Sequence, residues 1–236
     1  MPDLPTRSSL RVKSVANGEK GWPWQRDLLL LGIALGLLWA WDTVWVWPLK
    51  VLVVLFHETG HALATVATGG EVIQLTVSAN ESGAVYSAGG WPFVTLNAGY
   101  LGSLAWGLVL MYGSKRPRGA QLVSAGLGIL FLWIAAFWAR PLFSFGFVAT
   151  LGAATLFGAL ARWGGYGLAA VVLRIIGIFS VLYALGDVVD DVLMRPGAPS
   201  DARFLYERSG IPAIVWGLGW SAISLTMLRV LGPRLR

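Results

Sequence analysis

Apolar runs of about 20 residues follow one another along the chain, each long enough to cross a bilayer as a helix. Hydrophobic residues make up 56% of the sequence and charged residues only 13%, about half their usual share in soluble domains. A soluble protein of 236 residues lacks an interior large enough to hide so much apolar surface. The sequence therefore predicts a polytopic membrane protein, whose 13 tryptophans suit membrane–water interfaces.

The apolar runs predict six or seven transmembrane helices. The candidate spans are residues 28–47, 49–67, 91–112, 120–138, 141–161, 164–186 and 211–231. Residues 68–90 interrupt this pattern with glycine, serine and β-branched residues, so we predict a β-hairpin at 70–88. The expected fold class is an all-α polytopic membrane protein with a small β-hairpin after the second span. We interpret residues 1–26 as a mobile polar tail and residues 27–236 as a single transmembrane domain.

Charge and cysteine content exclude several classes of function. The net charge is +6 and the pI about 10.0, but no basic stripe is interleaved with exposed aromatic residues, as nucleic-acid binding would require. Lysine and arginine instead lie in loops, where they suit anionic lipid. Cysteine is absent, which rules out disulfides and cysteine-ligated metal. We therefore expect the lipid bilayer, and no nucleic acid, among the partners.

Both histidines of the chain lie in the apolar string LFHETGHAL at residues 55–63. His57 and His61 are four residues apart, so on a helix they point within about 40° of one another and lie about 6 Å apart along the axis. Imidazole is a good zinc ligand, and ionisable groups inside a membrane span mark functional sites because they are costly there. The pattern predicts a metal site at which Glu58 acts as general base on metal-bound water.

A hydrolytic zinc site needs a third protein ligand. With no further histidine and no cysteine, this ligand has to be a carboxylate. The candidates are Asp42, Glu71, Glu81, Asp187, Asp190 and Asp191. We favour Asp187, because among these acids it lies deepest in the apolar segment. Asp191 and Asp190, on the same helical face, are the alternatives. Asp201, in the string PSDARFLYE, is interpreted as the cap of a helix.

Three strings of the sequence together resemble the site-2 protease family of intramembrane zinc metalloproteases. They are HETGHALATVATGGEV, NAGYLGSLAWG, and YALGDVVDDVL followed by PSDARFL, and the resemblance extends over about 51–231. The chain looks most like a short bacterial and plant branch that lacks a PDZ domain. In the better-known members the third ligand stands in a Leu-Asp-Gly string with an upstream asparagine and proline. Here the order is LGD, so the identity of the aspartate stays open.

The resemblance implies hydrolysis of peptide bonds within or next to transmembrane helices of membrane-anchored substrates. It implies one Zn²⁺ held by His57, His61 and an aspartate, with Glu58 as catalytic base, in a multi-pass protein of a bacterial cell membrane. It also implies that the hairpin at 70–88 offers an edge to an unwound substrate. Asn97 would help to hold the substrate strand, and an asparagine that packs or caps helices is the alternative.

Two other functions fit parts of the sequence. A metal-binding membrane protein without proteolytic activity, an inactive homologue, would keep the same histidines and acids. An ion-coupled transporter would use intramembrane histidines and acids as an ion path, but transporters often contain paired repeats, and none is evident here. We therefore expect a zinc metalloendopeptidase before either alternative.

Overall fold

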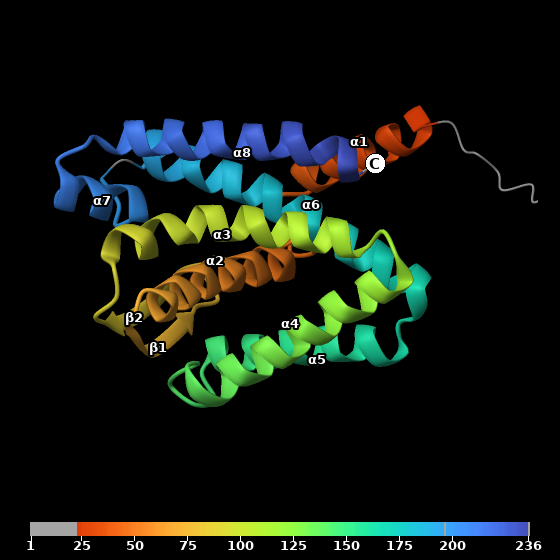
Figure 1. The fold of residues 1–236 in the computed structure, drawn as a ribbon, viewed down its shortest axis with the longest axis horizontal. Helices are drawn as coiled ribbons and strands as arrows, with labels where there is room; N and C mark the ends of the chain where they lie inside the picture. Colours follow the sequence, from red (N-terminus) through yellow and green to blue (C-terminus); the bar gives the residue numbers. More distant parts are fainter. Residues whose placement is uncertain (1–22, 196, 236) are drawn as a thin grey trace, which may run out of the picture.

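Helices make up most of the computed structural model, which describes residues 23–195 and 197–235 (Figure 1). The first elements are α1 (Pro23–Trp39), α2 (Trp47–Ala67), and the strands β1 (Glu71–Val77) and β2 (Gly83–Ala88). There follow α3 (Pro92–Gly113), α4 (Pro117–Phe137), α5 (Phe145–Trp163), α6 (Gly165–Val189), the π-helical turn η1 (Asp190–Met194), α7 (Asp201–Ser209) and α8 (Ala213–Leu235). The predicted all-α fold with one small hairpin is confirmed.

Six helices of the described part are long and apolar enough to cross a membrane. They are α2, α3, α4, α5, α6 with η1, and α8 up to Val230. The chain is thus a multi-pass membrane protein. Helix α1 has 17 residues and is not among the six; it begins at Pro23, within the segment expected to be a polar tail. The prediction for residues 1–22 lies outside the described residues, and the division into a tail and one domain stays a prediction.

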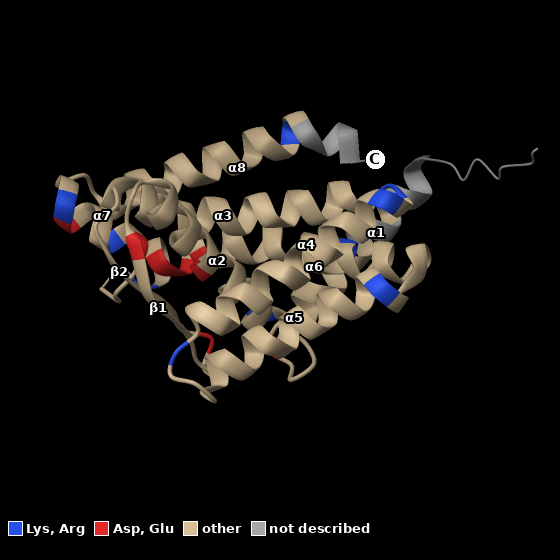
Figure 2. Cartoon of the chain, turned by 60° about the horizontal axis from the view of Figure 1, so that its bottom comes forward, with Lys and Arg blue, Asp and Glu red and all other residues tan. Residues whose placement is uncertain are grey.

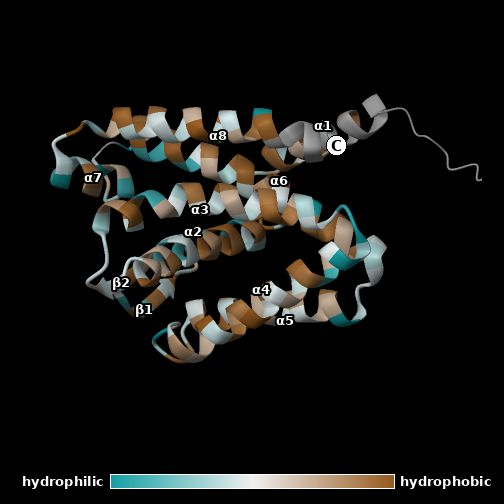
Figure 3. Cartoon of the chain, viewed as in Figure 1, coloured by the Kyte–Doolittle hydropathy of each residue, from teal (hydrophilic) through white to brown (hydrophobic). Residues whose placement is uncertain are grey.

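The surfaces of the helices suit a bilayer. Figure 2 shows charged residues mainly at helix ends and where α2, the hairpin and α7 meet. Figure 3 shows apolar residues along the lengths of α4, α5 and α8. Large apolar side chains such as Leu122, Ile129 and Leu218 point outward and are exposed. In water such surfaces would be unfavourable, whereas in lipid they face a medium as apolar as themselves.

Helix α2 lies inside the helix assembly, and its apolar window is the most buried of the six. It packs closely against α3, because Gly60 of α2 faces the backbone of Ala98 on α3. A Cβ on Gly60 would meet the Ala98 carbonyl oxygen and lie 3.4 Å from the Cα of Gly102. Small residues at these positions let two helix backbones approach, which places α3 directly against the histidine motif.

The strands β1 and β2 pair in antiparallel fashion, from Glu71 opposite Ala88 to Val77 opposite Gly83. The other edge of β1 is taken by the segment after α4. There the Leu75 N–H donates to the Trp138 carbonyl (2.8 Å), and the Arg140 N–H donates to the Leu75 carbonyl (3.2 Å). Among the described residues β2 has no second strand partner, so it forms the free edge of the hairpin.

Candidate metal centre

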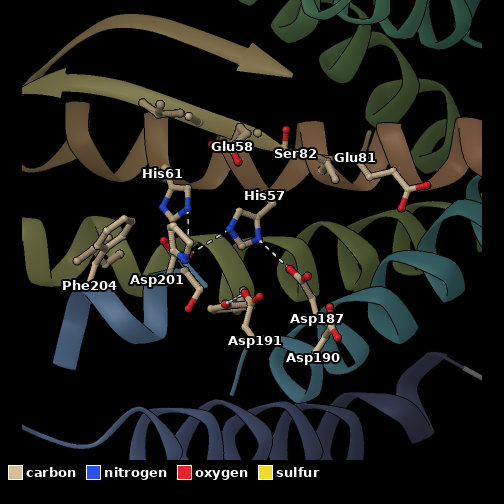
Figure 4. Close-up of a pocket in the computed structure, with 18 of the residues that line it drawn as sticks. His57, Glu58, His61, Glu81, Ser82, Asp187, Asp190, Asp191, Asp201 and Phe204 are labelled. Carbon is tan, nitrogen blue, oxygen red and sulfur yellow. Dashed lines mark hydrogen bonds and ion pairs between the residues drawn. The ribbon is translucent and has the colours of Figure 1, made fainter. Parts of the chain in front are cut away.

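Helix α2 places both histidines on one side, as their spacing predicts. The two rings lie 4.7 Å apart between centroids (Figure 4). Nδ1 of His61 lies 2.7 Å from the carbonyl oxygen of Thr95 on α3. Because a carbonyl only accepts hydrogen bonds, Nδ1 of His61 carries the proton and donates it. Nε2 of His61 is therefore the nitrogen that remains as a metal ligand.

The carboxylate that meets the histidines belongs to Asp201. Its Oδ2 lies 3.1 Å from Nε2 of His57 and 3.1 Å from Nε2 of His61 (Figure 4). In the part of the chain that the structure describes, these residues form the one His/Asp/Glu group whose ligand atoms lie within 4.8 Å of one another. In a tetrahedral zinc site with bonds of about 2.0–2.2 Å, ligand atoms are about 3.3–3.6 Å apart. Donor chemistry and spacing therefore both fit a divalent metal ion.

The interpretation of Asp201 as a helix cap is wrong. Ser200 caps α7, and its hydroxyl accepts a hydrogen bond from the Arg203 N–H at 3.3 Å. Asp201 is the first residue of the helix, and its side chain points toward α2 (Figure 4). Burial alone would raise the pKa of Asp201, but its interactions with His61 and His57 hold that pKa far below its usual value. The carboxylate is thus ionised at neutral pH and available to a cation.

The acids favoured as third ligand do not join the group of ligand atoms formed by His57, His61 and Asp201, and Asp187 lies at the other nitrogen of the His57 ring (Figure 4). Asp187 Oδ2 is 3.9 Å from Nδ1 of His57. Asp191 accepts a hydrogen bond from the Tyr100 hydroxyl. Asp190 accepts one from Nε of Arg195 at 2.8 Å.

In this geometry Asp201 replaces Asp187, and the alternatives Asp191 and Asp190, as the candidate third ligand. The physical reason is that the chain turns back after η1. This turn brings the start of α7 to the Nε2 side of both rings, whereas the end of α6 reaches only Nδ1 of His57.

Glu58 is buried and lies against the first residue of β2. A Cβ on Gly83 would meet Oε1 of Glu58 and lie 2.7 Å from its Cγ. Only glycine leaves room for the carboxylate at this point. The candidate base is thus enclosed between its own helix and the hairpin, on the same helix as the two histidines (Figure 4).

Gly99 of α3 keeps open the space next to the ligand atoms. A Cβ there would meet Nε2 of His57 and lie 2.6 Å from Oδ2 of Asp201. Any larger residue would occupy the space between the two ligands, so this cradle also fits a bound ion. Gly99 lies in the string NAGYLGSLAWG, which contributes to the family resemblance. No local sequence pattern predicts a role for this residue.

A cavity of about 1750 Å³ opens beside the metal centre. The hairpin, the end of α6 and the start of α7 line it, together with both histidines and Glu58. It exceeds the usual size of a small-molecule pocket, about 300–1,000 Å³. The space is large enough for water and for an extended peptide segment, and His57, His61 and Asp201 all line it.

Asn97 joins two helices in the structure. Its Nδ2 donates to the Phe93 carbonyl at 2.7 Å, and its Oδ1 accepts from the Trp220 indole N–H at 2.7 Å. The first contact lies within α3 and the second connects α3 to α8, as the helix-packing alternative expects. A role for Asn97 in holding a substrate stays a prediction.

A family model described as Peptidase M50B-like matches residues 30–231 of the chain. The matched region contains both histidines, Glu58, the hairpin and Asp201. No curated protein and no solved structure matches the chain. Since the family match covers most of the sequence, the chain belongs to the Peptidase M50B-like family and hence to the site-2 protease family that its motifs resemble.

Proposed function

We propose that this protein is an intramembrane zinc metalloprotease that hydrolyses peptide bonds within or next to transmembrane helices of membrane-anchored substrates. The proposed activity is supported most directly by one observation, the cluster of His57, His61 and Asp201 beside Glu58. Membership of a peptidase family supports the reaction class. The apolar spans support a membrane location, which we propose to be the cell membrane of a bacterium.

Each residue of the centre has a role in this proposal. His57 and His61, through Nε2, and Asp201, through Oδ2, would hold one Zn²⁺, which polarises a carbonyl and lowers the pKa of bound water. Glu58 takes the proton from the attacking water and later delivers it to the leaving amine. The Thr95 carbonyl holds the His61 ring in place through Nδ1.

The free edge of β2 suits an unwound substrate. Amides of a transmembrane helix are hydrogen-bonded within the helix, so cleavage requires local unwinding and new partners for them. A strand added along β2 would supply those partners. This edge lines the cavity and begins at Gly83, next to Glu58, so a segment bound there would lie beside the base.

Replacing Glu58 with glutamine tests the role of the base. We expect zinc content to stay at the wild-type level, because all three ligands remain. Turnover should fall by about 10²- to 10⁴-fold, the usual contribution of a general base. The measurement is cleavage of single-span test helices, with a central glycine or proline, in liposomes. Full turnover of Glu58→Gln would end the proposed role, and zinc-loaded wild type that cleaves no test helix would favour an inactive homologue.

Alanine variants of Asp201 and Asp187 test the ligand assignment as a matched pair. Asp201→Ala, like His57→Ala, should lose bound zinc. Asp187→Ala should keep it with affinity reduced by about 10- to 100-fold, as for loss of an outer-shell carboxylate. Zinc per chain, measured by atomic spectroscopy on the purified proteins, decides the matter. Zinc retained by Asp201→Ala but lost from Asp187→Ala would reverse the assignment.

A further inference from the structure

A buried lysine lies on the same helix as the metal centre. Lys50 on α2 is 8% exposed and precedes His57 by seven residues, about two helical turns. An ammonium group within a membrane span is costly unless it is paired, and such residues mark a functional interaction by default. The hydrolytic chemistry proposed above makes no use of this cation.

Lys50 pairs with the tip of the β-hairpin. Its Nζ lies 3.5 Å from Oε2 of Glu81, which stands in the turn between β1 and β2. A second carboxylate oxygen, Oδ1 of Asp42, lies 3.8 Å away, but the Asp42 side chain is 96% exposed and that of Glu81 only 29%. Because Glu81 is largely withdrawn from solvent, it is the carboxylate that depends on a nearby cation.

A neutral contact ties the same tip to the same helix. The indole N–H of Trp47, at the start of α2, donates to the Ala79 carbonyl at 2.9 Å. The turn itself is closed by the Ser78 N–H, which donates to the Ser82 carbonyl at 2.8 Å. The tip is therefore a formed turn that is attached to the beginning of α2 by one hydrogen bond and one ion pair.

The anchored tip leads directly to the catalytic base. Glu81 and Gly83 are separated by one residue, and Gly83 packs against the Glu58 side chain so closely that a Cβ would lie 2.7 Å from Cγ. The free edge of β2 begins at the same residue. A displacement of the tip is thus passed on to the backbone that confines Glu58 and to the edge beside it.

We propose that Lys50 is a positioning residue, whose ion pair with Glu81 anchors the hairpin tip and thereby holds Gly83 against Glu58 and the β2 edge beside the metal centre. Its effect on turnover rests on the proposed proteolytic function. The anchoring itself does not, so the two are tested separately.

A spin label measures the anchoring without any substrate. The chain has no cysteine, so one nitroxide attached at Ala79→Cys reports the motion of the tip in the full-length protein in liposomes. We expect an immobilised spectrum in the wild-type and Lys50→Arg backgrounds, and at least about threefold faster label motion in Lys50→Met and Glu81→Gln. Asp42→Asn is the matched control and should resemble wild type. A Lys50→Met spectrum identical to that of Asp42→Asn overturns the anchor.

Kinetics of the unlabelled variants measure the consequence. Lys50→Met and Glu81→Gln should each lower kcat about 10- to 100-fold, as a misplacement of about 1 Å in an active site does. Zinc content should stay unchanged in both. The double variant should be no slower than Lys50→Met, because two residues that act as one pair are not additive.

Two outcomes separate the proposals. Losses that multiply in the double variant would show independent roles and overturn the pairing. If wild type cleaves no test helix, the proposed function fails, while the spin label still decides whether Lys50 anchors the tip.

Discussion

Replacing Gly99 with alanine would disturb the metal centre by a single methyl group. The new Cβ would meet Nε2 of His57 and lie 2.6 Å from Oδ2 of Asp201. Comfortable contacts between non-bonded heavy atoms are about 3.5–4.0 Å, so the carboxylate and the imidazole have to move by about 1 Å. Helix α3 cannot easily retreat instead, because it also packs against α6: a Cβ on Gly107 would lie 2.8 Å from the Gly177 carbonyl oxygen, and the Ser180 hydroxyl donates to the Ser103 carbonyl at 2.7 Å.

A ligand shift of about 1 Å is several times the tolerance of about 0.2 Å within which metal–ligand distances are held. Loss of an outer-shell partner, which leaves the ligand in place, already costs about 10- to 100-fold in metal affinity. We therefore expect Gly99→Ala to weaken zinc binding by at least about 100-fold, equivalent to about 2.8 kcal/mol. Turnover should fall in proportion to the zinc that is lost.

Zinc affinity of the purified protein in detergent, measured by competition with a chromophoric chelator, checks this expectation. The control is Gly126→Ala, which adds the same methyl group to a span where nothing lies within 4 Å of the new Cβ. Thermal unfolding of the metal-free proteins tests whether each variant is folded. If Gly99→Ala binds zinc as tightly as Gly126→Ala, the space beside His57 is not the metal position.

Two further substitutions probe the surroundings of the centre. Gly83→Ala would place a Cβ on the Glu58 carboxylate, so kcat should fall about 100-fold with unchanged zinc content; a wild-type kcat would contradict the contact. Ser200→Ala removes the cap of the helix that presents Asp201, at a cost of about 1 kcal/mol, and zinc affinity should fall about fivefold. Ser200→Thr keeps a capping hydroxyl and should stay near wild type, and equal losses in both variants would argue against capping as the cause.

The sequence by itself determined the features that depend on local chemistry. Spans follow from the length of apolar runs, because a chain in lipid has to satisfy its backbone hydrogen bonds within each helix. The pairing of His57 with His61 follows from four-residue spacing on a helix, and the hairpin follows from turn signals and β-branched residues between two spans. Even the need for a carboxylate as third ligand followed from the absence of other donors in the chain.

Only the tertiary structure decided which carboxylate meets the histidines. Asp201 is 144 residues from His57, and nothing local distinguishes it from an ordinary acid at the start of a helix. Its place depends on where α6 ends and on the turn of the chain that returns α7 to α2. The roles of Gly99 and Gly83 are equally invisible in the sequence, since each consists of empty space beside a side chain from a different helix. Such contacts arise from packing between distant segments, and no periodicity or spacing within one segment encodes them.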